Sequence, residues 1–481
     1  MNLKITPTFP ATSQWPAGAV LLAARLCLAM VCCLAVPGRA EGIEAAQPGP
    51  ALAACLGRMG EAVDQAELLL PELGRAADRV AQRWVDGLQL HVAGDDCATD
   101  EAFYRAGSLI GMRRIGKLKK DKNGQQVTWG DVPARALIIY VLHRNSDPDL
   151  ILFEDLQRLL AKGDTVVLFG SSNWLACRRV VETLRADLGP ERFFFLDTGL
   201  AQDTALRTSR GIRYGETAGM ATTAHLWTFF AEVVAACTRR QRMPTIWPSG
   251  AIPQYSAWEQ TYGAVNFHDD LRIPPIEAGV LGQRYLQALR RQLHDCTGSA
   301  SQVAAAARTL AAVPDGKGVY VMVESHLLAG ETAFPSELPD WVLVQRSWRW
   351  NRAKPSLKAG DGVLWLGTFD WPVEAIASAQ ALPAVFVAAT LHGPNGAPQH
   401  TPLAGAARIT VEPPPPTEAL ATPGALWVPT PWQYPDAVVE LDFYPLPICP
   451  TSSVINGVLL WSIIGAVLEV RAPAGAASGP P

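Results

Sequence analysis

The stretch Val166–Leu184, VVLFGSSNWLACRRVVETL, passes from a β-branched apolar run through a short polar cluster into helical spacing. Gly170 stands where a tight turn would follow a strand, and apolar residues then recur at a period of three to four from Cys177 to Leu188. Gly189-Pro190 is a typical helix stop. The pattern predicts a strand, a turn and a helix that begins near Ser172, which is the repeating unit of a parallel sheet.

The same alternation of short apolar runs and longer helical patterns continues along the chain. The first set of strand candidates is 88–93, 136–142, 165–169 and 192–196, and the second set is 319–323, 341–345, 363–367, 384–389 and 407–411. Strands separated by helices predict parallel sheets covered by helices on both faces. A length of 481 residues favours two such domains over one.

Composition limits the functional classes. Apolar residues make up 49% and charged residues 18%, which is typical of a folded chain with a large core. The formal net charge is -4, and the one basic segment, 113–122, is short, so a nucleic-acid partner is not expected. We interpret that segment as a solvated loop.

The amino-terminal region differs from the rest. An unbroken apolar run, 26–36, follows Arg25 and precedes small residues, which predicts a secretory signal peptide over residues 1–40. An uncleaved membrane anchor is the alternative. Either way we expect export to a periplasmic or extracellular location, with membrane association possible through this segment. Three of the nine cysteines fall in it, and the other six show no metal-ligand spacing and are expected to be buried thiols.

Three later segments complete the outline. Residues 243–275 are rich in Pro, Gly and aromatics and predict an ordered connector, within which His268-Asp269-Asp270 is interpreted as a solvated acidic loop. The Pro-rich run 412–435 is expected to separate the last strand from a final helix over 454–470. That helix is apolar almost all round, which predicts burial in a core or a dimer interface rather than a membrane span. A disordered tail is expected over 472–481.

The polar cluster Ser171, Ser172 and Asn173 is the first candidate site. At a helix start beyond a parallel strand, backbone N–H groups and hydroxyls can point outward and bind an anion or a polyol at the carboxyl edge of the sheet. The alternative is that the same residues only cap the helix.

Several stretches together resemble the sugar isomerase (SIS) superfamily. The strand and turn through Asn173 resemble its phosphate-binding turn, 90–111 resembles the first strand and helix of phosphoheptose isomerases, 450–457 resembles the last SIS helix, and 357–367 looks like a second copy of 159–169. The resemblance implies an α/β fold of two flavodoxin-like three-layer units with parallel sheets. We expect these tandem SIS-like domains over 41–242 and 276–471, with 243–275 as the connector.

The resemblance also implies a function. It points to a sugar or sugar-phosphate ligand bound by Ser171, Ser172, Asn173, Thr99 and Trp174, and to aldose/ketose isomerisation. It implies no cofactor and no metal, and we expect a homodimer.

Departures from the family pattern weaken the isomerase interpretation. The family's glutamate base falls on Gly107 and Ser108, and Thr99 can only substitute for a hydroxyl that falls on Ala98. Asp95 and Asp96 beside the site would repel a phosphate by about 1 kcal/mol or more.

In the second unit Thr368–Trp371 replaces the serine-rich turn, so anion binding is expected to be lost there. Glu324 and His326, at the end of that unit's first strand, are the candidate catalytic base and proton shuttle. The alternative function is a non-catalytic exported carbohydrate-binding or scaffold protein with degenerate SIS domains.

Overall fold

The computed structural model divides into a segment, 1–46, and one compact unit, Gln47–Pro481, to which all described residues belong. The residues that the structure describes are 49–94, 101–103, 105–115, 119–120, 126–127, 135–142, 160–201, 203–248, 255–323, 340–346, 358–367, 383–389, 425–432 and 436–471.

The first sheet has five parallel strands in the order β2-β1-β5-β6-β7. These strands are β1 (Leu90–Gly94), β2 (Met112–Arg114), β5 (Leu137–Val141), β6 (Thr165–Gly170) and β7 (Phe193–Asp197). Sequence order therefore reverses between β1 and β5, the flavodoxin-like arrangement that places a topological switch point at the carboxyl ends of those two strands. Four of the five strands were predicted from the sequence, and the exception is the three-residue β2.

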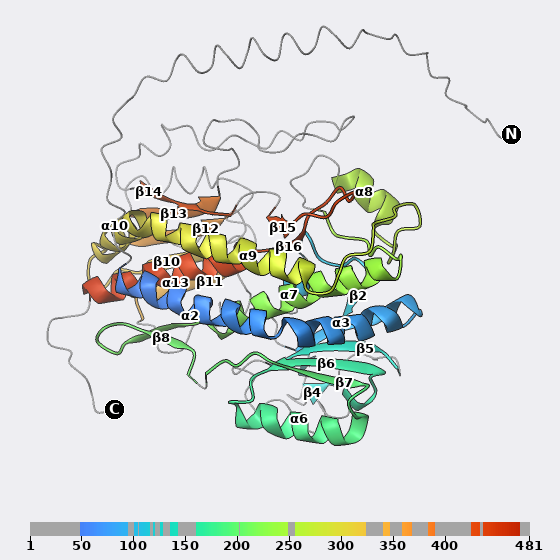
Figure 1. The fold of residues 1–481 in the computed structure, drawn as a ribbon. Coiled ribbons are helices and arrows are strands. Elements are labelled where there is room, and N and C mark those ends of the chain that lie inside the picture. The colour runs from blue at the N-terminus through green and yellow to red at the C-terminus, as the bar shows by residue number, and fades with distance from the viewer. Residues whose placement is uncertain are drawn as a thin grey trace, which may run out of the picture. The chain divides into compact units, whose positions relative to one another are not determined.

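The two faces of this sheet bury alternate residues. On β5, Leu137 and Ile139 join one hydrophobic cluster, while Ile138 and Tyr140 join another. The second cluster lies under α6 (Leu175–Leu188), and the first lies under α3 (Leu70–Val85) and α7 (Ala218–Arg239) (Figure 1). The helices on both faces confirm the predicted three layers. The predicted stop is also confirmed, since α6 ends at Leu188, although it begins at Leu175 rather than near Ser172.

The second sheet repeats the order of the first, as β11-β10-β12-β13-β14, again with every pair parallel. Its strands are β10 (Val319–Val323), β11 (Val342–Arg346), β12 (Gly362–Gly367), β13 (Ala384–Ala389) and β14 (Ala425–Thr430). The predicted strand 407–411 lies outside the described residues. The interpretation of 412–435 purely as a separator was wrong, because β14 lies inside it. Since β14 is an edge strand, it accommodates Pro429.

One hydrophobic cluster joins the inner faces of both sheets. It includes Val167 and Phe169 of β6, Leu364 and Leu366 of β12, and side chains from the long helices. Those helices are α2 (Pro50–Leu68), α3, α7, α9 (Val280–Asp295), α10 (Ala300–Ala311) and α13 (Ser452–Arg471). The two units therefore share a core.

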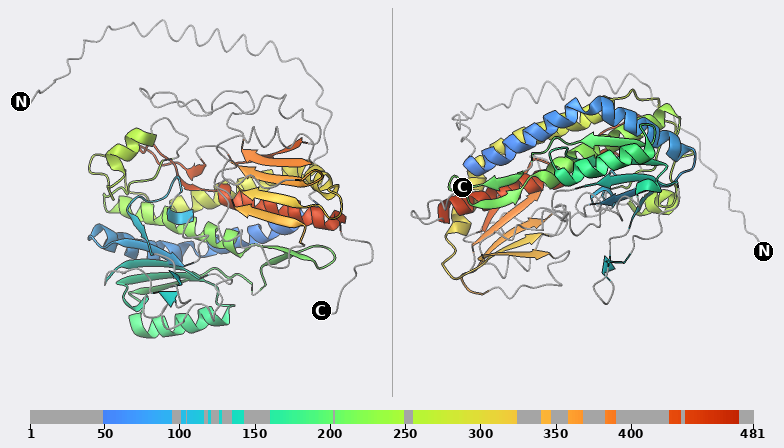
Figure 2. Two further views of the ribbon diagram at one scale, coloured as in Figure 1. Left: turned by 180° about the vertical axis from the view of Figure 1, so that it is seen from behind. Right: turned by 90° about the horizontal axis from the view of Figure 1, so that it is seen from below.

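The last helix, α13, lies within this shared core. It packs against α2, α7 and α10, and Figure 2 shows it in red alongside the strands of the second sheet. Among the described residues it is the one helix long and apolar enough to cross a membrane, and 83% of its most apolar window is buried inside the protein. It is therefore a core helix, one of the two buried positions predicted for it.

Smaller elements connect these layers. They are β3 (Lys119–Lys120) with β4 (Gln126–Val127), the hairpin of β8 (Ala205–Arg207) and β9 (Arg213–Glu216), the pair β15 (Ala437–Val439) and β16 (Ile448–Pro450), α8 (Tyr255–Tyr262) and the 3-10 helix η1 (Cys296–Ser299). The basic segment 113–122 is thus not simply a loop, since its ends contribute to β2 and β3. The cysteines in the described part of the chain are buried thiols, as expected: Cys55, Cys177, Cys237, Cys296 and Cys449.

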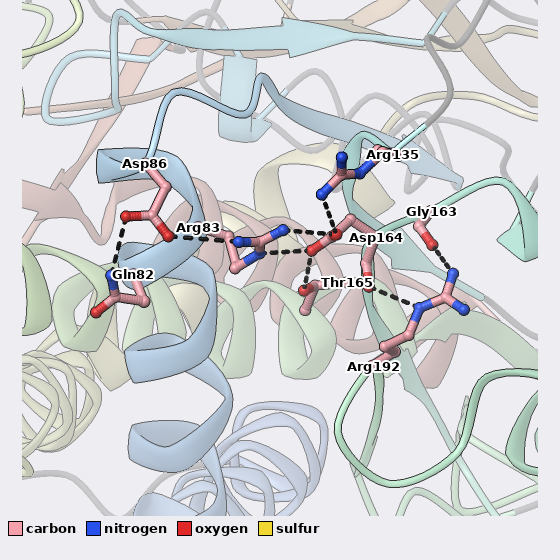
Figure 3. Close-up of polar contacts among 8 residues, drawn as sticks. All are labelled: Gln82, Arg83, Asp86, Arg135, Gly163, Asp164, Thr165 and Arg192. Carbon is pink, nitrogen blue, oxygen red and sulfur yellow. Dashed lines mark hydrogen bonds and ion pairs between the residues drawn. The ribbon is translucent and has the colours of Figure 1, made fainter.

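A polar network fastens α3 to the amino edge of the first sheet (Figure 3). Asp164, just before β6, accepts hydrogen bonds from Arg83 Nε and Nη2, both at 2.8 Å. Arg135 lies 3.8 Å from the same carboxylate, and Arg192 donates to the carbonyl oxygens of Gly163 and Asp164. These contacts lie at the edge opposite the strand ends where ligands bind in such sheets, which indicates a structural role.

Replacing Arg83 by alanine is expected to lower the free energy of unfolding by about 2 kcal/mol, because it leaves a mostly buried carboxylate without its bidentate partner. Chemical denaturation at pH 7 measures the change. Arg58→Ala is the matched control, since the Arg58–Glu61 pair is exposed and 3.5 Å apart, and it should change stability by less than about 0.5 kcal/mol. Equal losses in both variants would contradict a special role for Arg83.

Candidate functional site

The turn after β6 brings Ser171, Ser172, Asn173 and Trp174 together, but it directs the first hydroxyl inward. Ser171 is fully buried, and its Oγ donates to the carbonyl oxygen of Leu200 at 2.6 Å. The same Oγ accepts the backbone N–H of Asn173 at 3.2 Å. Ser171 therefore holds the turn against residues that follow β7, and its hydroxyl is not presented to a ligand.

Asp197 occupies the position that an anion would need. It is the last residue of β7, and its Oδ1 accepts the backbone N–H groups of Ser172 at 3.1 Å and Gly199 at 3.0 Å. A phosphate that bound these N–H groups would have to displace the carboxylate and would be repelled by it. At an effective dielectric constant near 20, that repulsion is on the order of a few kcal/mol at contact distance.

Asn173 and Trp174 are also engaged within the protein. The Asn173 side-chain amide donates to the carbonyl oxygen of Leu200 at 2.9 Å. The Trp174 indole is buried, packs in the cluster under α6, and donates Nε1–H to the carbonyl oxygen of Ala201 at 3.3 Å. Trp174 is thus a packing residue here, and its indole is not open to a sugar.

The topological switch point lies one strand away from this turn. Between the carboxyl ends of β1 and β5 the backbones approach closely, because a Cβ atom on Gly94 would lie 2.0 Å from the carbonyl oxygen of Val141. Gly94 also has a φ of +108°, which other residues rarely adopt. The crevice outside these two strand ends is where sheets of this order bind ligands. Thr99 and the acids Asp95 and Asp96 belong to the segment that follows β1 and lie outside the described residues.

The predicted catalytic pair of the second unit, Glu324 and His326, also lies outside the described residues, as does Thr368–Trp371. Their roles stay predictions.

A buried charged cluster, which the sequence did not reveal, lies just beyond β1. We call it the latch cluster; it consists of Glu101, Arg105, Asp436, Ser452 and Ser453, all of them buried. Arg105 Nη2 pairs with Asp436 and donates to Ser452 Oγ at 2.6 Å. Ser453 Oγ donates to Glu101 Oε2 at 2.7 Å. The spacing of Glu101 and Arg105 was the one local signal, and the partners lie more than 300 residues further along the chain.

Burial dominates the electrostatics of Glu101 and raises its pKa, while Arg105 and the Ser453 hydrogen bond oppose the rise. Trp227 of α7 donates Nε1–H to Glu101 Oε1 at 3.4 Å. An acid with a shifted pKa beyond a strand end is a candidate for function, but both oxygens of this carboxylate already accept hydrogen bonds. The arrangement holds segments together more readily than it would transfer a proton to a sugar.

The connector cluster was only partly predicted. Asp269 and Asp270 are exposed, but His268 is buried, and its Nε2 lies 3.0 Å from the hydroxyl oxygen of Tyr444. The rings of Trp258 and Tyr262 on α8 pack against His268, with centroids 5.5 and 4.5 Å away. The interpretation of this segment as a solvated loop was therefore wrong for His268, because aromatic residues from distant segments cover it. No group of three or more potential metal ligands occurs among the described residues.

Comparisons with known proteins bear on the fold alone. The sequence matches no protein-family profile and no curated protein. Similar solved structures include the C-terminal domain of glucosamine-fructose-6-phosphate aminotransferase from Francisella tularensis, at 8% identity and a TM-score of 0.47 over 87% of this chain and 96% of that one. A proposed sugar-binding protein from Salmonella typhimurium LT2 gives 10% identity and a TM-score of 0.42 over 87% and 99%. A proposed phosphosugar isomerase from Silicibacter pomeroyi DSS-3 gives 11% and 0.36 over 87% and 97%.

At these TM-scores the fold assignment rests on the strand order of the two sheets. Both sheets have the flavodoxin-like order, and they occur in tandem, as the resemblance to the SIS superfamily implied. The protein is an α/β protein that contains two parallel sheets of flavodoxin-like strand order in tandem.

Proposed function

We propose that the protein is a non-catalytic carbohydrate-binding protein that recognises a sugar without a phosphate at the carboxyl edge of the first sheet. The observation that carries the proposal is the Asp197 carboxylate on the N–H groups of Ser172 and Gly199, at 3.1 and 3.0 Å. A neutral hydroxyl group can approach such a carboxylate and donate to it, whereas a phosphate is repelled. Sheets with this strand order bind ligands outside the carboxyl ends of the two strands at the switch point, here β1 and β5.

The proposal also covers the location of the protein and its oligomeric state. We propose export, with residues 1–40 acting as a signal peptide or membrane anchor, and assembly as a homodimer. Export fits the proposed ligand, because phosphorylated sugars are mainly intracellular. Mass spectrometry of the mature amino terminus tests the first part, and light scattering of the purified protein tests the second.

Thermal shift with matched sugars tests the ligand class. Glucose, glucosamine and sedoheptulose are compared with their phosphate esters, each from micromolar to millimolar concentrations. A ligand at 100 times its Kd adds about 2.7 kcal/mol of stability, so a plain sugar that binds should raise Tm by a measurable few degrees. The phosphate esters should give no shift and no aldose/ketose conversion.

Variants of the turn sharpen this test. Asp197→Asn removes the repelling charge and should increase the response to phosphate esters, whereas Asp187→Asn, an exposed change on α6, should not. A shift of the unmodified protein by phosphate esters that disappears in Ser171→Ala would overturn the proposal and favour a phosphosugar isomerase. A response to neither class of sugar would favour a scaffold protein.

A further inference from the structure

The latch cluster joins parts of the chain that lie far apart in the sequence. Glu101 and Arg105 follow β1, Asp436 precedes β15, and Ser452 and Ser453 open α13. Asp436 Oδ1 accepts the backbone N–H of Ser452 at 3.0 Å, and its Oδ2 accepts the Ser452 hydroxyl at 2.9 Å. The cluster thereby connects the segment after β1 to the β15–β16 pair and to the amino end of the core helix.

The backbone around the cluster is held in unfavourable conformations. Asp436 and Cys449 have φ values of +75° and +61°, and neither is a glycine. Such conformations cost on the order of 1 kcal/mol each and persist where surrounding contacts enforce them. One of those contacts runs from Cys449 N–H to the carbonyl oxygen of Gly107, at 3.3 Å. Weakening the latch cluster would therefore release strain in the β15–β16 pair.

The charges in the cluster leave Glu101 poorly compensated. Arg105 Nη2 is committed to Asp436 and Ser452, so that only a 3.6 Å contact connects Arg105 Nε to Glu101 Oε1. Arg105 Nε and Nη1 are buried and make no hydrogen bond within the described part of the chain. Among the described residues, Arg105 is the one cation that pairs with Glu101, and it also pairs with Asp436. A buried carboxylate whose cation is shared in this way gains stability by taking up a proton.

We propose that the latch cluster is a proton-dependent latch between the first unit and the C-terminal β15–β16 pair. With a proton on Glu101, segment 105–111 is held against β16 and α13. When the proton is lost, an uncompensated charge remains inside the cluster, and the contacts of this segment loosen.

Other polar groups face Glu101 from the elements packed around it. Arg105 on the same segment pairs with Asp436, which lies ahead of β15. Burial raises the pKa of Tyr285 on α9 and of the Cys449 thiol on β16 well above their ordinary values, so both stay neutral. Trp227 of α7 and Ser453 of α13 contribute uncharged donors.

The sign of the pH effect follows from the charge state that burial disfavours. The pKa of Glu101 is raised in the folded protein. The contribution of Glu101 to the free energy of unfolding is therefore fully present below the ordinary pKa of glutamate, and it is lost as the pH rises through the raised, folded-state pKa. The latch is closed in acid and weakened in alkali.

Hydrogen exchange at pH 5.5 and 8.5, corrected for the intrinsic rate at each pH, tests the proposal. In the unmodified full chain, protection of segments 105–111 and 436–456 should fall by tenfold or more at the higher pH. Glu101→Gln should abolish the pH dependence, because the amide keeps an acceptor for Ser453 and carries no charge. Glu277→Gln, away from the cluster, should retain the dependence.

Asp436→Asn provides a second, independent route to the same outcome. Asparagine tolerates the left-handed conformation, and without the Asp436 charge Arg105 is free to compensate Glu101, so protection should again become independent of pH. Equal protection of the unmodified chain at both pH values would overturn the proposal. A pH dependence that persists in Glu101→Gln would overturn it as well. If either variant fails to fold, the other variant and the unmodified chain decide the outcome. None of these results depends on the sugar proposed above.

Discussion

Gly465→Ala is expected to destabilise the protein by about 2 kcal/mol, although alanine is about 1 kcal/mol more favourable than glycine inside a helix. A Cβ atom at position 465 of α13 would lie 2.5 Å from Cζ of Tyr214 and 2.9 Å from the Cβ of Ala51. Both neighbours are buried, one on β9 and the other on α2, so neither can move aside without cost. Urea denaturation measures the loss.

The matched control is Gly60→Ala in the middle of α2. A Cβ atom there meets nothing within 4 Å, so the same substitution should be neutral or stabilising by up to about 1 kcal/mol. Combining Gly465→Ala with Tyr214→Leu should cost less than the sum of the single changes, because the ring is the main obstacle. Strict additivity, or a gain in stability from Gly465→Ala alone, would show that α13 and the β8–β9 hairpin are not in close contact.

Acid is expected to destabilise the protein through His225. This residue lies on α7 and is fully buried; its Nδ1 lies 2.8 Å from the carbonyl oxygen of Ala221, and its Nε2 makes no hydrogen bond. Burial lowers its pKa from 6.5 to about 4. Between these two pH values the imidazole is protonated in the unfolded chain but not in the folded chain. The contribution of neutral His225 to the free energy of unfolding is therefore intact above pH 6.5 and falls as the pH falls, by about 3 kcal/mol at pH 4.

Unfolding by urea at pH 7.5, 6.5, 5.5 and 4.5 measures the slope of the free energy of unfolding against pH. His225→Phe should flatten it, whereas His294→Gln, on the exposed side of α9, should leave it unchanged. A residual slope should remain in His225→Phe because burial also lowers the pKa of His268. A variant slope equal to that of the unmodified protein would exclude His225 as the source.

The sheets could be predicted from the sequence because their strands are continuous apolar runs whose two faces are both buried, and such runs are visible locally. The end of α6 was equally local, since Gly189 has a φ of +71° at the helix end. In contrast, β14 was missed because an edge strand can include Pro429 within a Pro-rich run. The three-residue β2 was hidden in a basic segment because its edge position leaves Arg113 exposed.

The candidate site could not be predicted to the same depth, because long-range partners decide its geometry. The residues Ser171–Asn173 form a turn as expected, but Asp197 and the carbonyl of Leu200 determine where their donors point. The latch cluster depends on residues 331 positions apart in the chain, Arg105 and Asp436. Local patterns indicate which residue types gather at a strand end, and they do not indicate which distant group neutralises them.

The position of α13 also constrains how the protein acquires its structure. This last helix packs against α2, the first helix described, and fills the centre of the core that both sheets share. Until α13 packs against α2, α7 and α10, the apolar interior that these helices share stays exposed. Chains in which α13 has not yet packed therefore expose apolar surface, and such partly folded chains are prone to aggregation.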